Sequence, residues 1–98
     1  LSLGASGGVV AVAGCAPEAT TAVYRAFKAG DHDRARTLQL ALTPLAIAVT
    51  ATYGVAGLKA AVTLSGRRGG NPRPPLPAAT EAEVGEIKRL MDAARAAL

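Results

Sequence analysis

The sequence predicts part of an α/β fold, in which one buried β-strand is followed by four helices. Residues 9–13 form an apolar run with no polar face, which is typical of a strand covered on both sides in a parallel sheet or barrel. Apolar stripes at spacings of three and four follow it, as in amphipathic helices. A strand, a short loop and then a helix is the repeating unit of α/β folds.

The predicted strand, Val9–Ala13, follows the glycine pair Gly7-Gly8. A lone buried strand cannot satisfy its own backbone N–H and C=O groups, and the 98 residues offer no second strand. We therefore expect the chain to be a fragment whose strand partners lie on other segments, and a first residue Leu1 in place of methionine fits that expectation. A structure that coils this stretch into a helix, or leaves it unpaired while the rest folds compactly, would overturn the barrel origin.

A helix over about residues 17–29 should complete the first unit. Pro17 suits the first helical position, and Gly30 suits the end of the helix. Asp31 is expected to cap the next helix. Residues 1–30 are thus predicted as one βα unit, and residues 31–98 as a C-terminal helical region.

Three helices are predicted in that C-terminal region. The first should be kinked by Pro44, and the second should cover about residues 55–65. Residues 69–77 contain four of the six prolines and must be an extended connection. Thr80 and Glu83 form a capping box that opens the last helix. The apolar stripes expected to be buried are Ala35, Leu38, Leu42, Leu45 and Val49 on the first of these helices, and Val84, Ile87, Met91, Ala94 and Leu98 on the last.

Composition predicts a thin core. Half of the residues are hydrophobic, but many of these are alanine, and only 3% of the chain is aromatic. The single cysteine, Cys15, excludes an internal disulfide and fits a reducing compartment, so we expect a cytoplasmic protein. The net charge of +4 is carried by scattered basic residues, which do not predict a nucleic-acid partner.

Residues 37–58 carry no charge, over a length that could cross a bilayer. Gln39, Pro44 and Gly54 interrupt this stretch, so two helices buried against other protein are the better interpretation. No membrane partner is therefore expected. The alternative function is a small helical interaction module, or a membrane-associated one, without enzymatic activity.

Glycine and arginine motifs offer no site of their own. The glycines of residues 4–8 precede a predicted strand, whereas phosphate-binding loops place them between a strand and a helix. Arg67-Arg68 has no interleaved aromatic residue for base stacking, which indicates a solvated loop. No cluster has metal-ligand spacing, so neither a metal nor a cofactor is expected.

No catalytic residue is predicted within the chain. Cys15 and the only histidine, His32, should lie at opposite ends of a helix, too far apart for a nucleophile–base pair. A Schiff-base lysine must be desolvated at a strand end, whereas all three lysines fall on predicted helices. Lys59 has the most apolar neighbours, and we interpret it as structural.

Five segments, in order, resemble the C-terminal third of the dihydrodipicolinate synthase/N-acetylneuraminate lyase family. Residues 3–13, followed by Pro17, are similar to its glycine turn and eighth barrel strand, and residues 30–36 resemble its "G-D-x-x-x-A-R" helix start. Residues 42–45 are similar to its "x-x-P-L", residues 57–61 to its "V/L-K-x-A", and residues 73–77 to its "R-x-P-L" connection. Together these motifs cover essentially the whole chain.

The resemblance implies the end of a (β/α)8 TIM barrel: the last strand, helix 8 and three C-terminal helices. It further implies a pyruvate-dependent class I aldolase, a homo-oligomer (dimer or tetramer), in which a barrel lysine forms a Schiff base with a 2-oxo acid and a tyrosine relays protons. In the family those groups come from earlier strands, and neither Tyr24 nor Tyr53 matches the tyrosine. The fragment alone is therefore expected to be inactive.

Within this chain the resemblance assigns substrate contacts to the strand alone. Val9 matches the apolar residue beside the bound pyruvate, and Gly8 lets the backbone approach. Ala11 stands where sialic-acid lyases tend to have a serine, and its methyl group cannot donate a hydrogen bond, which argues against a sialic acid substrate. Gly14 replaces a common asparagine. Residues that choose among dihydrodipicolinate synthesis, 4-hydroxy-2-oxoglutarate cleavage and 2-keto-3-deoxy sugar-acid cleavage are expected upstream.

Overall fold

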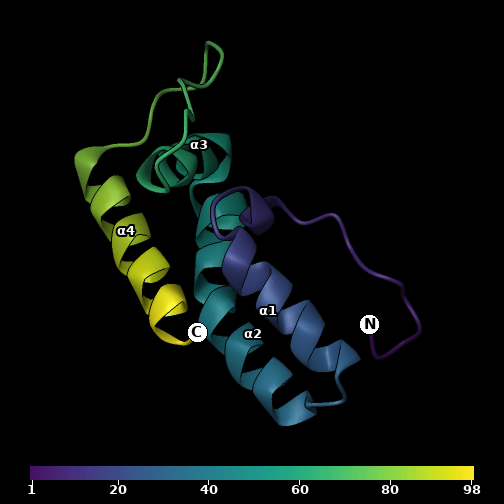
Figure 1. Ribbon diagram of the computed structural model, residues 1–98. Helices are drawn as coiled ribbons and strands as arrows, with labels where there is room; N and C mark the ends of the chain where they lie inside the picture. The colour runs from purple at the N-terminus through teal and green to yellow at the C-terminus, as the bar shows by residue number, and fades with distance from the viewer.

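The computed structural model describes all residues from 1 to 98, and its only regular elements are helical (Figure 1). They are a short 3-10 helix η1 (Ala11–Gly14), α1 (Pro17–Lys28), α2 (His32–Ile47), a π-helical turn η2 (Ala48–Thr52), α3 (Gly54–Leu64) and α4 (Glu81–Ala96). The four predicted helices are confirmed. The chain as it stands is mostly α, as predicted for a barrel fragment, whereas the predicted strand is wrong.

The stretch predicted as a strand divides into two parts. Residues 5–10 have no regular structure, and residues 5–9 make no hydrogen bond of any kind. Residues 11–14 instead wind into η1, where the N–H of Ala13 donates to the carbonyl of Val10 at 3.1 Å. The physical reason is the one that argued for missing neighbours: a strand without a partner leaves its backbone groups unpaired, whereas a helical turn pairs some of them locally.

Helices α1 and α2 lie side by side, joined by a tight turn (Figure 1). Pro17 occupies the first position of α1, as predicted. Gly30, with φ of 80°, provides the left-handed residue that ends the helix. The predicted cap of α2 is also confirmed, because the carboxylate of Asp31 accepts a hydrogen bond from the N–H of Arg34 at 3.0 Å.

Pro44 does not end α2. The helix continues to Ile47 and then widens into the π-helical turn η2, in which the N–H of Tyr53 donates to the carbonyl of Ala48 at 2.9 Å. The uncharged residues 37–58 are thereby distributed over α2, η2 and the start of α3. None of the helices combines the length and the hydropathy that a membrane crossing needs.

Residues 65–80 form the extended connection between α3 and α4 and project away from the helices (Figure 1). Two hydrogen bonds hold its start: the Lys59 ammonium donates to the Gly69 carbonyl at 3.1 Å, and the Gly69 N–H donates to the Thr63 hydroxyl at 3.2 Å. The predicted capping box then opens α4. Glu83 N–H donates to the Thr80 hydroxyl at 3.2 Å, and Thr80 N–H donates to the Glu83 carboxylate at 3.4 Å.

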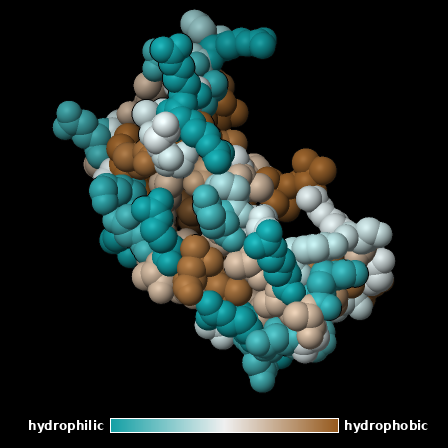
Figure 2. All heavy atoms as spheres, viewed as in Figure 1, coloured by the Kyte–Doolittle hydropathy of each residue, from teal (hydrophilic) through white to brown (hydrophobic).

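One small core joins η1 to all four helices and η2. Its largest fully buried side chains are Leu45, Val49 and Ile87, whereas Leu98, expected in the buried stripe of α4, is half exposed. The radius of gyration is 14.0 Å, against about 12.6 Å for a compact domain of this length. The accessible surface of 6286 Å² exceeds the roughly 5200 Å² typical of this mass. Hydrophobic atoms accordingly reach the surface in several places (Figure 2).

Candidate functional site

The largest cavity, about 770 Å³, lies between the N-terminal segment and the helix pair α1–α2. Residues 6–8 and 10–12 form one wall, α1 contributes Thr20 and Tyr24, and α2 contributes Leu42 and Ile47 among others. None of the 16 lining residues has a charged side chain. Such a surface can hold an apolar segment or an uncharged molecule, and Tyr24 is its only titratable side chain, with no carboxylate, imidazole or cationic side chain beside it.

The three predicted substrate-binding residues are placed differently from one another. Gly8 and Ala11 line this cavity, while Val9 is fully exposed and does not. In a strand, residues 9 and 11 would share a face, because side chains alternate. In the observed extended segment followed by a 3-10 turn, Val10 joins Gly8 and Ala11 in the cavity wall instead.

None of the three lysines reaches the cavity. Lys59, half-buried on α3, donates to the Gly69 carbonyl and holds the connecting loop. Lys88 pairs with Asp92 one turn along α4, at 2.7 Å, and Lys28 is exposed in the last turn of α1. The sequence did not predict this contact between Lys59 and the connecting loop.

Cys15 and His32 form no pair. The Cys15 thiol is buried and donates to the Val12 carbonyl at 3.4 Å, and burial raises its pKa although a backbone hydrogen bond partly opposes that effect. His32 packs edge-on against Phe27, with ring centroids 5.0 Å apart. Helix α1 separates the two residues by roughly 18 Å at 1.5 Å per residue. The buried thiol is a packing residue in a form that resists ionisation.

The arginine pair Arg67-Arg68 forms no binding site in the structure. The Arg67 guanidinium donates to the Gly14 carbonyl at 3.2 Å and so ties the loop after α3 to the end of η1. Arg68 is exposed. No group of three or more histidine, cysteine, aspartate or glutamate side chains is arranged to hold a metal ion.

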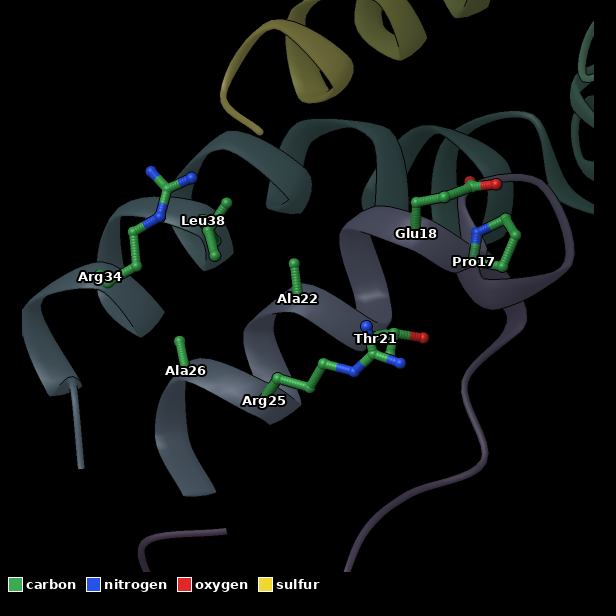
Figure 3. Close-up of a pocket in the computed structure, with 8 residues that line it drawn as sticks. All are labelled: Pro17, Glu18, Thr21, Ala22, Arg25, Ala26, Arg34 and Leu38. Atoms are coloured by element: carbon green, nitrogen blue, oxygen red, sulfur yellow. The ribbon is translucent and has the colours of Figure 1, made fainter. Parts of the chain in front are cut away.

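A second groove, of about 480 Å³, follows the other side of α1, and the sequence did not predict it. Figure 3 shows the eight residues that line it: Pro17, Glu18, Thr21, Ala22, Arg25, Ala26, Arg34 and Leu38. Ala22 and Ala26, one helical turn apart, point toward Leu38 and form its floor. The Arg34 guanidinium donates a hydrogen bond to the Leu98 carbonyl at 3.2 Å. With one carboxylate, two guanidinium groups and no nucleophile, this groove is a solvated surface, and it gives α1 a charged side opposite its uncharged one.

The chain belongs to the dihydrodipicolinate synthetase family, whose family model matches residues 1–94. The family resemblance drawn from five short motifs is thereby confirmed over nearly the whole chain. No solved structure matches the chain significantly.

Several curated relatives are similar to the chain. A 4-hydroxy-tetrahydrodipicolinate synthase of Corynebacterium diphtheriae is 34% identical over 92 residues, which are 94% of this chain and 31% of the relative. A 4-hydroxy-tetrahydrodipicolinate synthase of Methanopyrus kandleri is 41% identical over 81 residues, 83% of this chain and 27% of the relative. An uncharacterized DapA-like lyase of Halobacterium salinarum is 40% identical over 76 residues, 78% of this chain and 25% of the relative. The chain thus spans about a third or less of the relatives it matches.

Proposed function

We propose that this chain is the C-terminal part of a Schiff-base-forming, pyruvate-dependent lyase that resembles dihydrodipicolinate synthase. The observation that carries the proposal is the family match over residues 1–94, together with relatives named 4-hydroxy-tetrahydrodipicolinate synthase. In the parent that we propose, residues 1–30 are the last unit of a (β/α)8 barrel and residues 31–98 are helices beside it. The parent is a cytoplasmic homo-oligomer that takes pyruvate or another 2-oxo acid as substrate.

By this proposal the isolated chain is inactive. Imine formation needs a nucleophilic amine in a dry pocket. Lys59 holds a loop carbonyl and Lys88 is paired on the surface of α4, so neither meets that need. The Schiff-base lysine and the proton-relaying tyrosine therefore belong to the part of the parent outside this chain.

Gly8, Val9 and Ala11 are the residues of this chain that we assign to the substrate pocket of the parent. All three lie in the uncharged N-terminal segment. Once the segment is a strand, Val9 and Ala11 turn to one face. Val9 then contacts the 2-oxo acid, and the Ala11 methyl group leaves the distal end of the substrate without a hydrogen-bond donor.

Borohydride trapping tests this proposal. The full-length parent, incubated with pyruvate and sodium borohydride, should gain one reduced pyruvyl adduct on a lysine that lies outside residues 1–98. The isolated chain should gain none under the same conditions, and a Lys59→Arg variant of the parent should be trapped as well as the unmodified parent. An adduct on Lys28, Lys59 or Lys88, or a parent that is not trapped at all, would contradict the proposal.

One observation favours the second candidate, a helical interaction module without enzymatic activity. Four helices share a buried cluster without any strand. If that module is the functional unit, the 98 residues alone should be monodisperse and melt in one cooperative transition. The lyase proposal predicts aggregation or a weakly cooperative, molten state, because the core is thin and the uncharged cavity between the N-terminal segment and α1–α2 is open to solvent. Calorimetry and sedimentation of the isolated chain separate the two.

A further inference from the structure

One side-chain hydrogen bond joins the first 30 residues to the helices that follow them. The Arg67 guanidinium, in the loop after α3, donates to the Gly14 carbonyl at 3.2 Å, across 53 positions of the sequence. Apart from the turn between α1 and α2, no other hydrogen bond connects residues 1–30 with residues 31–98. A bond from a guanidinium group to a carbonyl is charge-assisted and therefore stronger than a neutral one. Arg67 thus fixes the end of η1 relative to α3.

The loop that carries Arg67 is itself fastened to α3. The Arg67 N–H donates to the Val62 carbonyl at 3.3 Å. Two residues further on, the Lys59 ammonium donates to the Gly69 carbonyl at 3.1 Å, and the Gly69 N–H donates to the Thr63 hydroxyl at 3.2 Å. These bonds hold the backbone on both sides of the arginine, so its side chain loses less freedom on binding than it would on a free loop.

Gly14, which accepts the bond, also lies against α3, and η1 and α3 are neighbours in the fold (Figure 1). A Cβ atom at Gly14 would lie 3.9 Å from Val62 Cγ2 and 4.0 Å from Leu58 Cδ1, so its backbone is close to both side chains. Leu58 and Val62 are in turn packed against the buried core. Apolar contact and the Arg67 bond therefore hold the same short piece of backbone from one helix.

Gly14 directly follows the residues that we assign to the substrate pocket, at the carboxyl end of the predicted strand. Barrel enzymes place their reacting groups at that end of the strands. We propose that Arg67 is a positioning residue of the lyase, whose bond to the Gly14 carbonyl sets where the pocket-lining segment ends. It thereby places Val9 and Ala11 against the bound 2-oxo acid, and it acts through the backbone rather than by touching the substrate. The inference rests on the proposed function, which supplies that substrate.

Borohydride trapping of the full-length parent at a series of pyruvate concentrations tests this role. Arg67→Ala is the test variant. Arg68→Ala is its matched control, because Arg68 is also exposed and its side chain makes no hydrogen bond or ion pair. For Arg67→Ala we expect the pyruvate concentration at half-maximal trapping to rise about three- to tenfold, since a displaced pocket wall holds the substrate less well. The amount trapped at saturating pyruvate should not change, because the Schiff-base lysine lies outside residues 1–98.

Arg67→Lys separates this role from a general contribution to stability. An ammonium group also donates to a carbonyl, so this variant should return the half-maximal concentration to within about twofold of the unmodified parent. Arg68→Ala should stay within the same range, although it removes the same charge from the neighbouring position. Thermal melting temperatures of all three variants should lie within about 3 °C of the parent, because both arginines are exposed.

Three results would refute the positioning role: an unchanged half-maximal concentration in Arg67→Ala, an equal rise in Arg68→Ala, or no recovery in Arg67→Lys. An equal rise in Arg68→Ala would show that positive charge near the pocket attracts the anionic substrate and that position has no part in the effect. Failure of the proposed function is distinguishable, because an unmodified parent that borohydride does not trap refutes the lyase and leaves Arg67 no substrate to position. A trapped parent that Arg67→Ala does not affect refutes the role of Arg67 alone.

Discussion

Residues 1–10 and residues 11–98 differ in where their hydrogen-bond partners lie. The helical part satisfies its backbone within each helix and caps its ends with neighbours in sequence, such as Asp31 and Thr80. The N-terminal segment contains the start of the predicted strand but no strand partner, and its residues 5–9 make no hydrogen bond. The comparison teaches that local signals are sufficient for helices, whereas a strand is realised only where a second strand is present.

The largest contrast should come from removing a buried side chain in each region. Leu45→Ala empties a fully buried position at the centre of the core and should cost about 2–5 kcal/mol, enough to abolish the weakly cooperative transition expected of the isolated chain. Val9→Ala removes a fully exposed side chain and should change stability by less than about 0.5 kcal/mol. Urea titration followed by circular dichroism at 222 nm measures both. If Val9→Ala destabilised the isolated chain as Leu45→Ala does, the segment would already be packed.

A substitution at Gly69 tests whether the two hydrogen bonds between the connecting loop and α3 stabilise the helical part. A Cβ atom there would overlap the Lys59 carbonyl oxygen and lie 2.6 Å from the Thr63 hydroxyl, so Gly69→Ala should break the anchor and cost about 1–3 kcal/mol. Gly85→Ala is the matched control. It lies in α4 with open space around its Cβ, and it should stabilise the chain by about 0.5–1 kcal/mol. Thermal melts should therefore shift in opposite directions, and equal shifts would contradict the loop geometry.

The capping box of α4 should have a smaller effect. Thr80→Ala removes the hydroxyl that accepts the Glu83 N–H, and should cost about 1 kcal/mol. Thr37→Ala, at an exposed position inside α2, removes a hydroxyl that donates only to the Asp33 carbonyl of the same helix at 3.0 Å, and it serves as the control. Denaturant midpoints that move equally for both variants would show that the cap adds nothing to the stability of α4.

The smallest expected effect is a loss of stability at alkaline pH caused by ionisation of Cys15, a buried residue just after η1. Burial raises the pKa of this thiol in the folded chain above its value in the unfolded chain. The resulting stability is fully present below the unfolded-state pKa and is lost as the pH rises through the folded-state pKa. Cys15→Ala should remove that part of the alkaline decline seen in urea midpoints. A decline identical in both chains would show that Cys15 ionises as freely when folded as when unfolded.

Much of the helical architecture could be predicted from the sequence, because its signals act within a few residues. Pro17, Gly30, Asp31 and the Thr80–Glu83 box placed helix ends to within one residue. The π-helical turn after Pro44 was not predicted, since the apolar spacing of residues 45–49 fits an α-helix equally well. Nor was the groove of Figure 3, because its lining depends on how α1 and α2 pack.

The assignment of Gly8, Val9 and Ala11 to a substrate pocket stays a prediction. In the structure Gly8 and Ala11 share a cavity wall and Val9 lies outside it. Val9 and Ala11 would share a face only in a strand, and this segment does not form one. Lys59 was interpreted as structural, through an ion pair or helix packing, and its contact in the structure is instead a hydrogen bond to the Gly69 carbonyl.

The predicted strand therefore no longer supports a barrel origin, and the family match does. An unpaired stretch beside a compact fold would have argued against that origin, and residues 5–9 are indeed unpaired. Residues 11–14 are also coiled into the helical turn η1, so by that criterion the chain on its own argues against the barrel origin. The family match over residues 1–94 now carries the proposal. The uncharged cavity between the N-terminal segment and α1–α2 is consistent with it, because such a surface can be covered by other protein.

Amide hydrogen exchange at residues 6–10, measured in the isolated chain and in a full-length parent that contains it, tests the central claim most directly. We predict rapid exchange in the isolated chain, where these amides have no partner, and protection by at least a hundredfold in the parent, where they are paired as a strand. Rapid exchange in both would show that the segment is never a strand and would contradict the account.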